Sequence, residues 1–257
     1  ASESAIARDL GGKLGIGLMT WALDADDTLL GAALEQQPEL ISLSFGDPAP
    51  YVEEAHRVGA LVCSQINTLE DLRVVESAGV DFVVAQGSEA GGHTGHVATL
   101  PLMQLVLETT DLPGVVAGGI GTGRGLAAVL AAGAVGGWIG TALLASPETT
   151  GADYARERLV SARSTDTVYT SIFDRARSQP WPARWGGRAL VNEYTRRWHD
   201  RPDADVAELA DAYDKDDPDI GVVYAGQAAG MVGGIEPAGD VVRRIGAEAE
   251  ERLGRLR

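Results

Sequence analysis

The chain has 257 residues, of which 45% are hydrophobic, and a formal net charge of −16. This length suits one large domain with a sizeable core, such as a (β/α)₈ barrel of about 250 residues. The acidic balance argues against nucleic-acid and anionic-membrane partners, because both require clustered Lys and Arg. The sequence shows no signal-peptide pattern and no apolar run near the roughly 18 residues of a membrane span. Composition therefore predicts a cytoplasmic protein without nucleic-acid or membrane partners.

The only cysteine is Cys63, so no disulfide can form within the chain. It lies in the apolar run 60–63, which favours a plain buried thiol over a reactive one. This cysteine usage also agrees with a reducing compartment.

Short apolar runs alternate with amphipathic stretches through the first half of the chain. The apolar runs predict strands buried on both faces, as in parallel sheets, at 15–20, 40–45, 60–66, 81–86, 114–118 and 135–140. The amphipathic stretches predict helices at 26–37, 51–58, 69–78, 102–109 and 123–132. Thr68 is expected to cap one of these helices, and Gly59, Gly79 and Gly133 are expected to end three of them in the left-handed conformation.

Repeated βα units form either a closed barrel or an open doubly wound sheet. A barrel has eight strands, whereas the pattern predicts six. The first predicted strand begins at residue 15, so we expect two βα units of a complete barrel to precede Ala1. The predicted fold class is therefore α/β, a (β/α)₈ TIM barrel without its first two βα units in this chain. Residues 1–257 are predicted to form a single domain.

The stretch 146–218 breaks the βα rhythm and predicts a helical insertion late in the chain. It is polar between Trp181, Trp185 and Trp198, and prolines flank Trp181. A lid, a contact in a homodimer and a merely packed insertion all remain open interpretations. After it, 237–256 predicts a closing helix that begins at a proline.

Bare glycines follow the last two predicted strands, Gly118 and Gly119 after one and Gly140 after the other. Such positions let backbone N–H groups approach a phosphate, and the helix predicted from residue 123 would add a favourable dipole. Barrels commonly bind phosphate after strands seven and eight, which these would be if two strands precede. The spacing does not match GxGxxG. Tight turns without a ligand are the alternative.

A glycine-rich loop, residues 87–95, follows the fourth predicted strand, where barrel active sites lie. Gly91 and Gly92 would let a flat ligand approach the backbone. His93 titrates near neutrality and could abstract a carbon-bound proton, although a structural hydrogen bond is an equal alternative on this pattern alone. His93 and His96 lack the further ligands that a metal needs, so no metal site is expected.

The chain resembles the nitronate monooxygenase family, formerly the 2-nitropropane dioxygenases. The resemblance rests on the segments QGSEAGGH, AGGI and IGT at 86–93, 117–120 and 139–141. Further similarity lies in SFGDP, ASPE and AGQ at 44–48, 145–148 and 225–227. It implies a TIM-barrel flavoprotein with FMN held without a covalent bond.

The matching positions and their glycine neighbours predict cofactor contacts at Gln86, Gly91, Gly92, Gly118, Gly119, Trp138, Ile139, Gly140 and Thr141. His93 matches the family's catalytic histidine and would be the general base for neutral nitroalkanes. The resemblance implies that FMN and O₂ oxidise an alkyl nitronate to a carbonyl compound and nitrite. One departure is Gly17, where relatives often carry Asn, which puts one flavin or substrate hydrogen bond in doubt.

Two other functions fit the same motifs. One is an FMN- and NADH-dependent reductase acting on enoyl-acyl-carrier-protein or quinones, since such enzymes share the glycine–histidine loop. The other is a barrel that binds flavin or phosphate without catalysis. A nicotinamide donor would be essential to the reductase and irrelevant to a nitronate oxidase.

Overall fold

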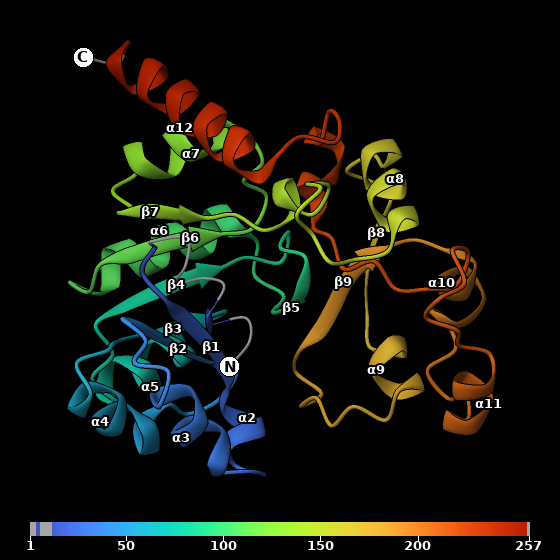
Figure 1. Cartoon of the computed structure of the whole chain (residues 1–257), viewed down its shortest axis with the longest axis horizontal. Coiled ribbons are helices and arrows are strands. Elements are labelled where there is room, and N and C mark those ends of the chain that lie inside the picture. The colour runs from blue at the N-terminus through green and yellow to red at the C-terminus, as the bar shows by residue number, and fades with distance from the viewer. Residues whose placement is uncertain (1–3, 6–11, 256–257) are drawn as a thin grey trace.

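The computed structural model describes residues 4–5 and 12–255. Its centre is a parallel sheet of six strands in the order β1-β2-β3-β4-β6-β7. The strands are β1 (Gly15–Met19), β2 (Leu40–Ser44), β3 (Leu61–Ile66), β4 (Phe82–Gln86), β6 (Gly114–Ala117) and β7 (Gly136–Trp138). Each of the six apolar runs therefore forms a strand, and each strand pairs with the next one in the central sheet (Figure 1).

This strand order is that of six successive strands of a (β/α)₈ barrel, so the α/β class is confirmed. Within the described residues the sheet stays open, because β1 and β7 each have one neighbour in it. All five pairings are parallel, which places the carboxyl ends of the strands along one rim. In barrels that rim carries the functional loops.

Helices follow the strands. Five of them match the predicted amphipathic stretches, with ends shifted by a few residues, whereas the four-residue helix directly after β1 was not predicted. The helices are α2 (Thr20–Leu23), α3 (Thr28–Leu34), α4 (Ala49–Arg57), α5 (Leu69–Ser77), α6 (Thr99–Thr109) and α7 (Gly123–Ala131). The Thr68 hydroxyl accepts a hydrogen bond from the Asp71 N–H and caps α5 as predicted. Gly59, Gly79 and Gly133 have φ values of 84°, 82° and 106°, the left-handed helix ends expected of them.

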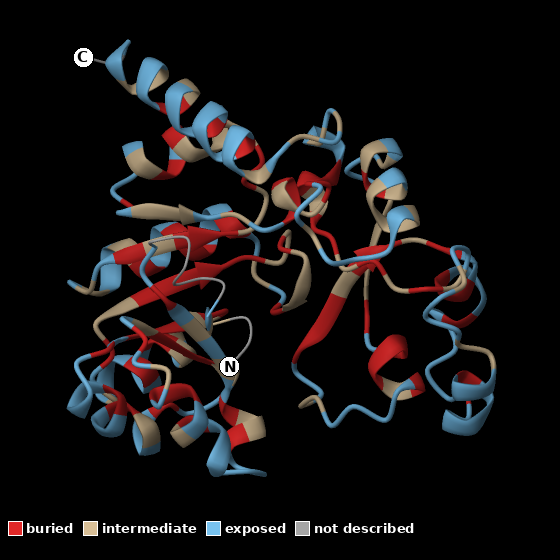
Figure 2. Cartoon of the chain, in the orientation of Figure 1, coloured by how far each residue is buried: buried red, intermediate tan, exposed pale blue. Residues whose placement is uncertain are grey.

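The core lies between the sheet and these helices, where Figure 2 shows β2, β3, β4 and β6 largely buried. The end strands β1 and β7 are half-buried or exposed, so the prediction of strands buried on both faces was wrong for these two, because each has a neighbour on one side only. Ile41, Val62 and Val83 come from three adjacent strands and are fully buried in one apolar cluster. Cys63 is buried as predicted, and burial raises the pKa of its thiol to about 11. The side chains of β2 to β4 thus form the rigid base on which the rim loops rest.

The late segment, residues 146–218, lies beside the sheet and is helical only in part (Figure 1). Its elements are α8 (Asp153–Ser161), β8 (Thr167–Thr170), α9 (Ile172–Ala176), β9 (Gly186–Leu190), α10 (Glu193–Trp198) and α11 (Val206–Asp211). A helical insertion was expected, but the segment also contains strands, because β9 pairs antiparallel with β8 and with β5 (Gly92–Thr94). The histidine loop therefore contains a short strand, β5. This strand was not predicted, because a three-residue strand that includes glycine shows no alternating pattern in the sequence. Trp198 packs with Phe173 and Tyr194 in this segment's own core.

The chain closes with η1 (Thr141–Leu143), η2 (Gln227–Met231) and α12 (Ala238–Gly254), the last as predicted. Helix α12 packs across α7, and Gly123 is where they meet: a Cβ there would lie 2.7 Å from the Ala249 backbone nitrogen. Among the described residues, no helix is both long and apolar enough to span a membrane.

Candidate active site

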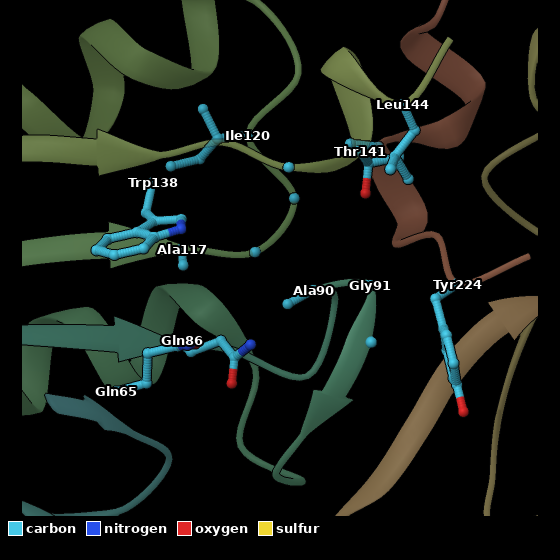
Figure 3. Close-up of a pocket in the computed structure, with 15 residues that line it drawn as sticks. Gln65, Gln86, Ala90, Gly91, Ala117, Ile120, Trp138, Thr141, Leu144 and Tyr224 are labelled. Atoms are coloured by element: carbon cyan, nitrogen blue, oxygen red, sulfur yellow. The ribbon is translucent and has the colours of Figure 1, made fainter. Parts of the chain in front are cut away.

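A cavity of about 320 Å³ opens at the carboxyl ends of β3, β4, β6 and β7 (Figure 3). Gln86 and Trp138 approach it from the sheet side, while Tyr224 approaches from the opposite side. The lining residues are Gln65, Gln86, Ala90, Gly91, Gly92, Ala117, Gly118, Gly119, Ile120, Trp138, Gly140, Thr141, Leu144, Tyr224 and Ala228. Its volume falls at the lower end of the range of roughly 300–1,000 Å³ that is typical of ligand pockets.

Eight of the nine residues predicted to contact a cofactor line this cavity. Ile139 does not, because its side chain packs into the apolar clusters beneath α7 and α12. Segments far apart in the sequence therefore converge on one space, as the strand-end argument predicts.

The glycine turn after β6 suits a close approach by a phosphorylated, flat ligand. Gly118 and Gly119 have φ values of 104° and 70°, which side chains rarely tolerate. A Cβ on Gly118 would also lie 2.6 Å from the Thr99 hydroxyl oxygen, so the backbone there must stay bare. Trp138 leaves 41% of its surface exposed beside the cavity, enough to be covered by an aromatic ring. These features suit a flat ligand that carries a phosphate.

The residues at the start of α7 do not line the cavity. The Gly123 N–H donates a hydrogen bond of 3.1 Å to the Glu248 carboxylate of α12. A carboxylate at a helix N-terminus uses the same donors and dipole that a phosphate would. The sequence pattern did not reveal this partner, because Glu248 lies on a helix 125 residues away in the sequence.

The histidine loop is held by close backbone packing. A Cβ on Gly91 would lie 2.6 Å from the Gly226 nitrogen, and the Gln227 N–H donates to the Glu89 carbonyl at 2.9 Å. The Glu89 carboxylate accepts hydrogen bonds from the Thr99 N–H and hydroxyl, both at 2.8 Å, and so caps α6. Across the part of the chain that the structure describes, no three metal-ligating side chains come together.

Gln86 joins the cavity wall to the histidine strand. Its side-chain amide donates to the His93 carbonyl at 3.1 Å, and its amide oxygen accepts from Asn67 at 3.1 Å. The Trp185 indole N–H donates in turn to the Asn67 side-chain oxygen at 3.0 Å. All three side chains are buried, so Gln86 has a fixed orientation.

His93 is not among the residues that line the cavity, although its neighbours Gly91 and Gly92 are. Its Nε2 lies 2.9 Å from the Asp174 Oδ2, and the two side chains are only 10% and 4% exposed. The Trp181 ring stacks on the imidazole with centroids 3.4 Å apart and planes 5° from parallel. Tyr224 links the cavity to the surroundings of His93, because it lines the cavity and its ring centroid lies 5.6 Å from that of His93.

Asp174 belongs to a small buried polar network. Its Oδ1 accepts hydrogen bonds from the Arg177 guanidinium at 3.4 Å and from the Tyr224 hydroxyl at 3.3 Å. Arg177 also donates to the Tyr224 oxygen at 2.8 Å. Burial, and next the negative charge of Asp174, raise the pKa of Tyr224 above its usual range. The hydroxyl is therefore a hydrogen-bond donor at neutral pH.

Asp174, Trp181 and Tyr224, the side chains that surround His93, are among the site residues that the sequence did not reveal. Trp181 stood out only by its flanking prolines, and Tyr224 only by its place before the AGQ segment. Asp174 gave no signal, since an acidic residue in a short helix is usually a surface residue. Trp181 is held by ring contacts with Trp21 at 5.2 Å and Phe45 at 5.1 Å, which bring the late segment onto the sheet rim.

Parallel βα units with a glycine-lined cavity at their carboxyl ends define an enzyme of the α/β barrel class. The family model for nitronate monooxygenase matches residues 7–248, so the chain belongs to the nitronate monooxygenase family. It is 31% identical over 254 residues to a nitronate monooxygenase of Paraburkholderia phytofirmans, covering 91% of this chain. The chain spans 67% of that relative's length.

Solved structures agree with this membership. FabK from Thermotoga maritima superposes with a TM-score of 0.82 at 28% identity, covering 95% of this chain and 78% of FabK. A nitroalkane oxidase from Streptomyces ansochromogenes superposes with a TM-score of 0.80 at 28% identity, covering 96% of this chain and 83% of the oxidase. The barrel assignment is thus supported along nearly the whole chain.

Proposed function

We propose that this chain is an FMN-dependent enzyme that oxidises alkyl nitronates with O₂ to carbonyl compounds and nitrite. The observation that carries the proposal is the convergence of the glycine turn, Gln86 and Trp138 on one cavity, with the half-buried His93 next to its lining residue Gly92. Membership of the nitronate monooxygenase family supports the substrate class.

Each part of the cavity has a chemical task in this proposal. Backbone N–H groups at Gly118–Gly119 and Gly140–Thr141 would bind the FMN phosphate. Gln86 and Trp138 would contact the flavin ring. The cofactor, when bound, supplies electron acceptance and reaction with O₂, while the protein orients the substrate and excludes water.

His93 acts as the general base in this proposal. A neutral nitroalkane must lose its α-proton before it can be oxidised, whereas a nitronate has already lost it. The base therefore matters for nitroalkanes and is dispensable for nitronates. Since Tyr224 lines the cavity and its ring centroid lies 5.6 Å from that of His93, the substrate is expected to bind on the Tyr224 side of the flavin.

The test is a visible spectrum of the purified full-length protein, before and after titration with FMN, followed by O₂ consumption with an alkyl nitronate. We expect flavin absorbance, saturable FMN binding and nitronate-dependent O₂ uptake. NADH oxidation with a quinone or an enoyl thioester, without nitronate turnover, would assign the reductase function instead. Failure to bind FMN at all would overturn both.

A further inference from the structure

The hydrogen bond between His93 and Asp174 has a defined direction. An ionised carboxylate only accepts hydrogen bonds, so the proton between Oδ2 and Nε2 comes from the imidazole. Arg177 and Tyr224 donate to the other carboxylate oxygen and balance its buried charge. The imidazole is therefore held with its proton on Nε2.

The other ring nitrogen of His93 is left free. Within residues 12–255, Nδ1 makes no hydrogen bond, and it is not one of the buried polar atoms that lack a partner. It therefore keeps some access to the surrounding space. A flip of the ring would break the bond to Asp174, and during the rotation the imidazole would have to push past Trp181, which is stacked on it with centroids 3.4 Å apart.

We infer that Asp174 is a positioning residue that fixes His93 as the Nε2–H tautomer and so makes Nδ1 the proton-accepting nitrogen. The inference rests on the proposed role of His93 as general base. It also gives the late segment a function: α9 delivers the carboxylate, and the neighbouring turn delivers Trp181, to a histidine 81 residues earlier in the chain.

The proton transfer is balanced as follows. The α-proton of a neutral nitroalkane passes to Nδ1, and the C–H electron pair becomes the C=N bond of the nitronate while the nitro oxygens take the negative charge. The imidazolium that forms keeps its Nε2–H bond to the Asp174 carboxylate. Such charge-assisted hydrogen bonds are about twice as strong as neutral ones, so this pairing favours proton transfer.

The first test is independent of catalysis. Long-range ¹⁵N–¹H NMR of the imidazole reports which nitrogen carries the proton, and the chain has only four histidines, so a His93→Gln variant assigns the signals. We expect the Nε2–H form in the unaltered protein and a shift to the Nδ1–H form in Asp174→Asn, whose amide can donate to Nε2. An Nδ1–H form in the unaltered protein would overturn the inference.

The second test compares two substrates in the FMN-loaded protein. We expect Asp174→Asn to lower kcat/KM for a neutral nitroalkane by about 10²-fold or more, because the wrong nitrogen carries the proton. Turnover of the preformed nitronate should stay within about threefold, since it needs no base. Asp174→Glu retains the carboxylate and should restore part of the nitroalkane activity.

The matched control is Asp81→Asn. Asp81 forms a similar pair with His56, with 3.0 Å between Oδ2 and Nε2, but neither residue lines the cavity. It should leave the turnover of both substrates unchanged. If Asp174→Asn lowered the turnover of the nitroalkane and of the nitronate equally, with FMN affinity and near-UV circular dichroism intact, the positioning role would be contradicted. If the unaltered protein oxidised no nitro compound, the proposed function would fail, while the NMR result would still decide the tautomer.

Discussion

The Gln86 side-chain amide donates a hydrogen bond to the His93 carbonyl oxygen across 3.1 Å, and so connects the end of β4 to the histidine strand β5. The same side chain lines the cavity in which FMN is proposed to bind. The position of the proposed base and the shape of the cofactor wall are therefore coupled through one buried amide.

Replacing Gln86 by Leu should affect both functions at once. The His93 carbonyl would lose its donor, at a cost of about 1–3 kcal/mol for an unsatisfied buried group. We expect weaker FMN binding and roughly tenfold lower nitroalkane turnover, consistent with a lost hydrogen bond and a displaced base. Flavin fluorescence quenching measures FMN binding, and O₂ uptake measures turnover. Gln104→Leu is the control, because Gln104 makes a solvent-exposed hydrogen bond to the Leu100 carbonyl. If the two variants changed FMN binding and turnover equally, the coupling would be refuted.

Gly118→Ala tests the bare backbone of the phosphate turn. The substitution places a Cβ 2.6 Å from the Thr99 oxygen at a φ of 104°. We expect about 1–3 kcal/mol lower free energy of unfolding and a raised Kd for FMN. Gly133→Ala has a similar φ of 106° but open space and no cavity contact. Gly133→Ala should therefore lower the stability without changing FMN binding. Unchanged FMN binding in Gly118→Ala would argue against a phosphate site at this glycine turn.

Glu248→Gln tests the assignment of the α7 terminus. Loss of the charge at the Gly123 N–H should lower the free energy of unfolding by about 0.3–1 kcal/mol. The FMN affinity should not change, because this carboxylate is a partner of α7 and not of the cavity. Tighter FMN binding in the variant would mean that the helix terminus belongs to the phosphate site after all.

Cys63 predicts a loss of stability at alkaline pH. Its pKa is raised by burial from 9.0 to about 11, so above pH 9 the unfolded chain releases this proton before the folded protein does. Unfolding therefore becomes easier from pH 9 towards pH 11, by at most on the order of 2–3 kcal/mol. Urea unfolding at pH 8 and 10.5 should show a smaller decline in Cys63→Ala. Identical declines would mean that the thiol does not contribute.

The features that were predictable from sequence depend on local patterns. Apolar runs bounded by glycine located the six strands, and Gly118 and Gly140 were found because parallel strand ends share one rim, while Gln86 was found through the family resemblance. Thr68 and Gly133 were interpretable because caps depend on residues within one turn.

The features that were missed depend on contacts between distant segments. The Asp174 carboxylate reaches His93 only because β9 pairs with β5, and a three-residue strand containing glycine has no detectable period. Glu248 reaches the start of α7 only through the packing of α12 at Gly123. The polar composition of the late segment indicated an insertion but not its inward-facing side chains.

The most direct test of the central claim is the ratio of kcat/KM for a neutral nitroalkane to that for its nitronate, in FMN-loaded protein with and without His93→Asn. We predict that the substitution lowers the nitroalkane value by about 10²–10⁴-fold and leaves the nitronate value within a few-fold, because only the former needs a base. An unchanged ratio between the two substrates would contradict the role of His93 as the proton-accepting base.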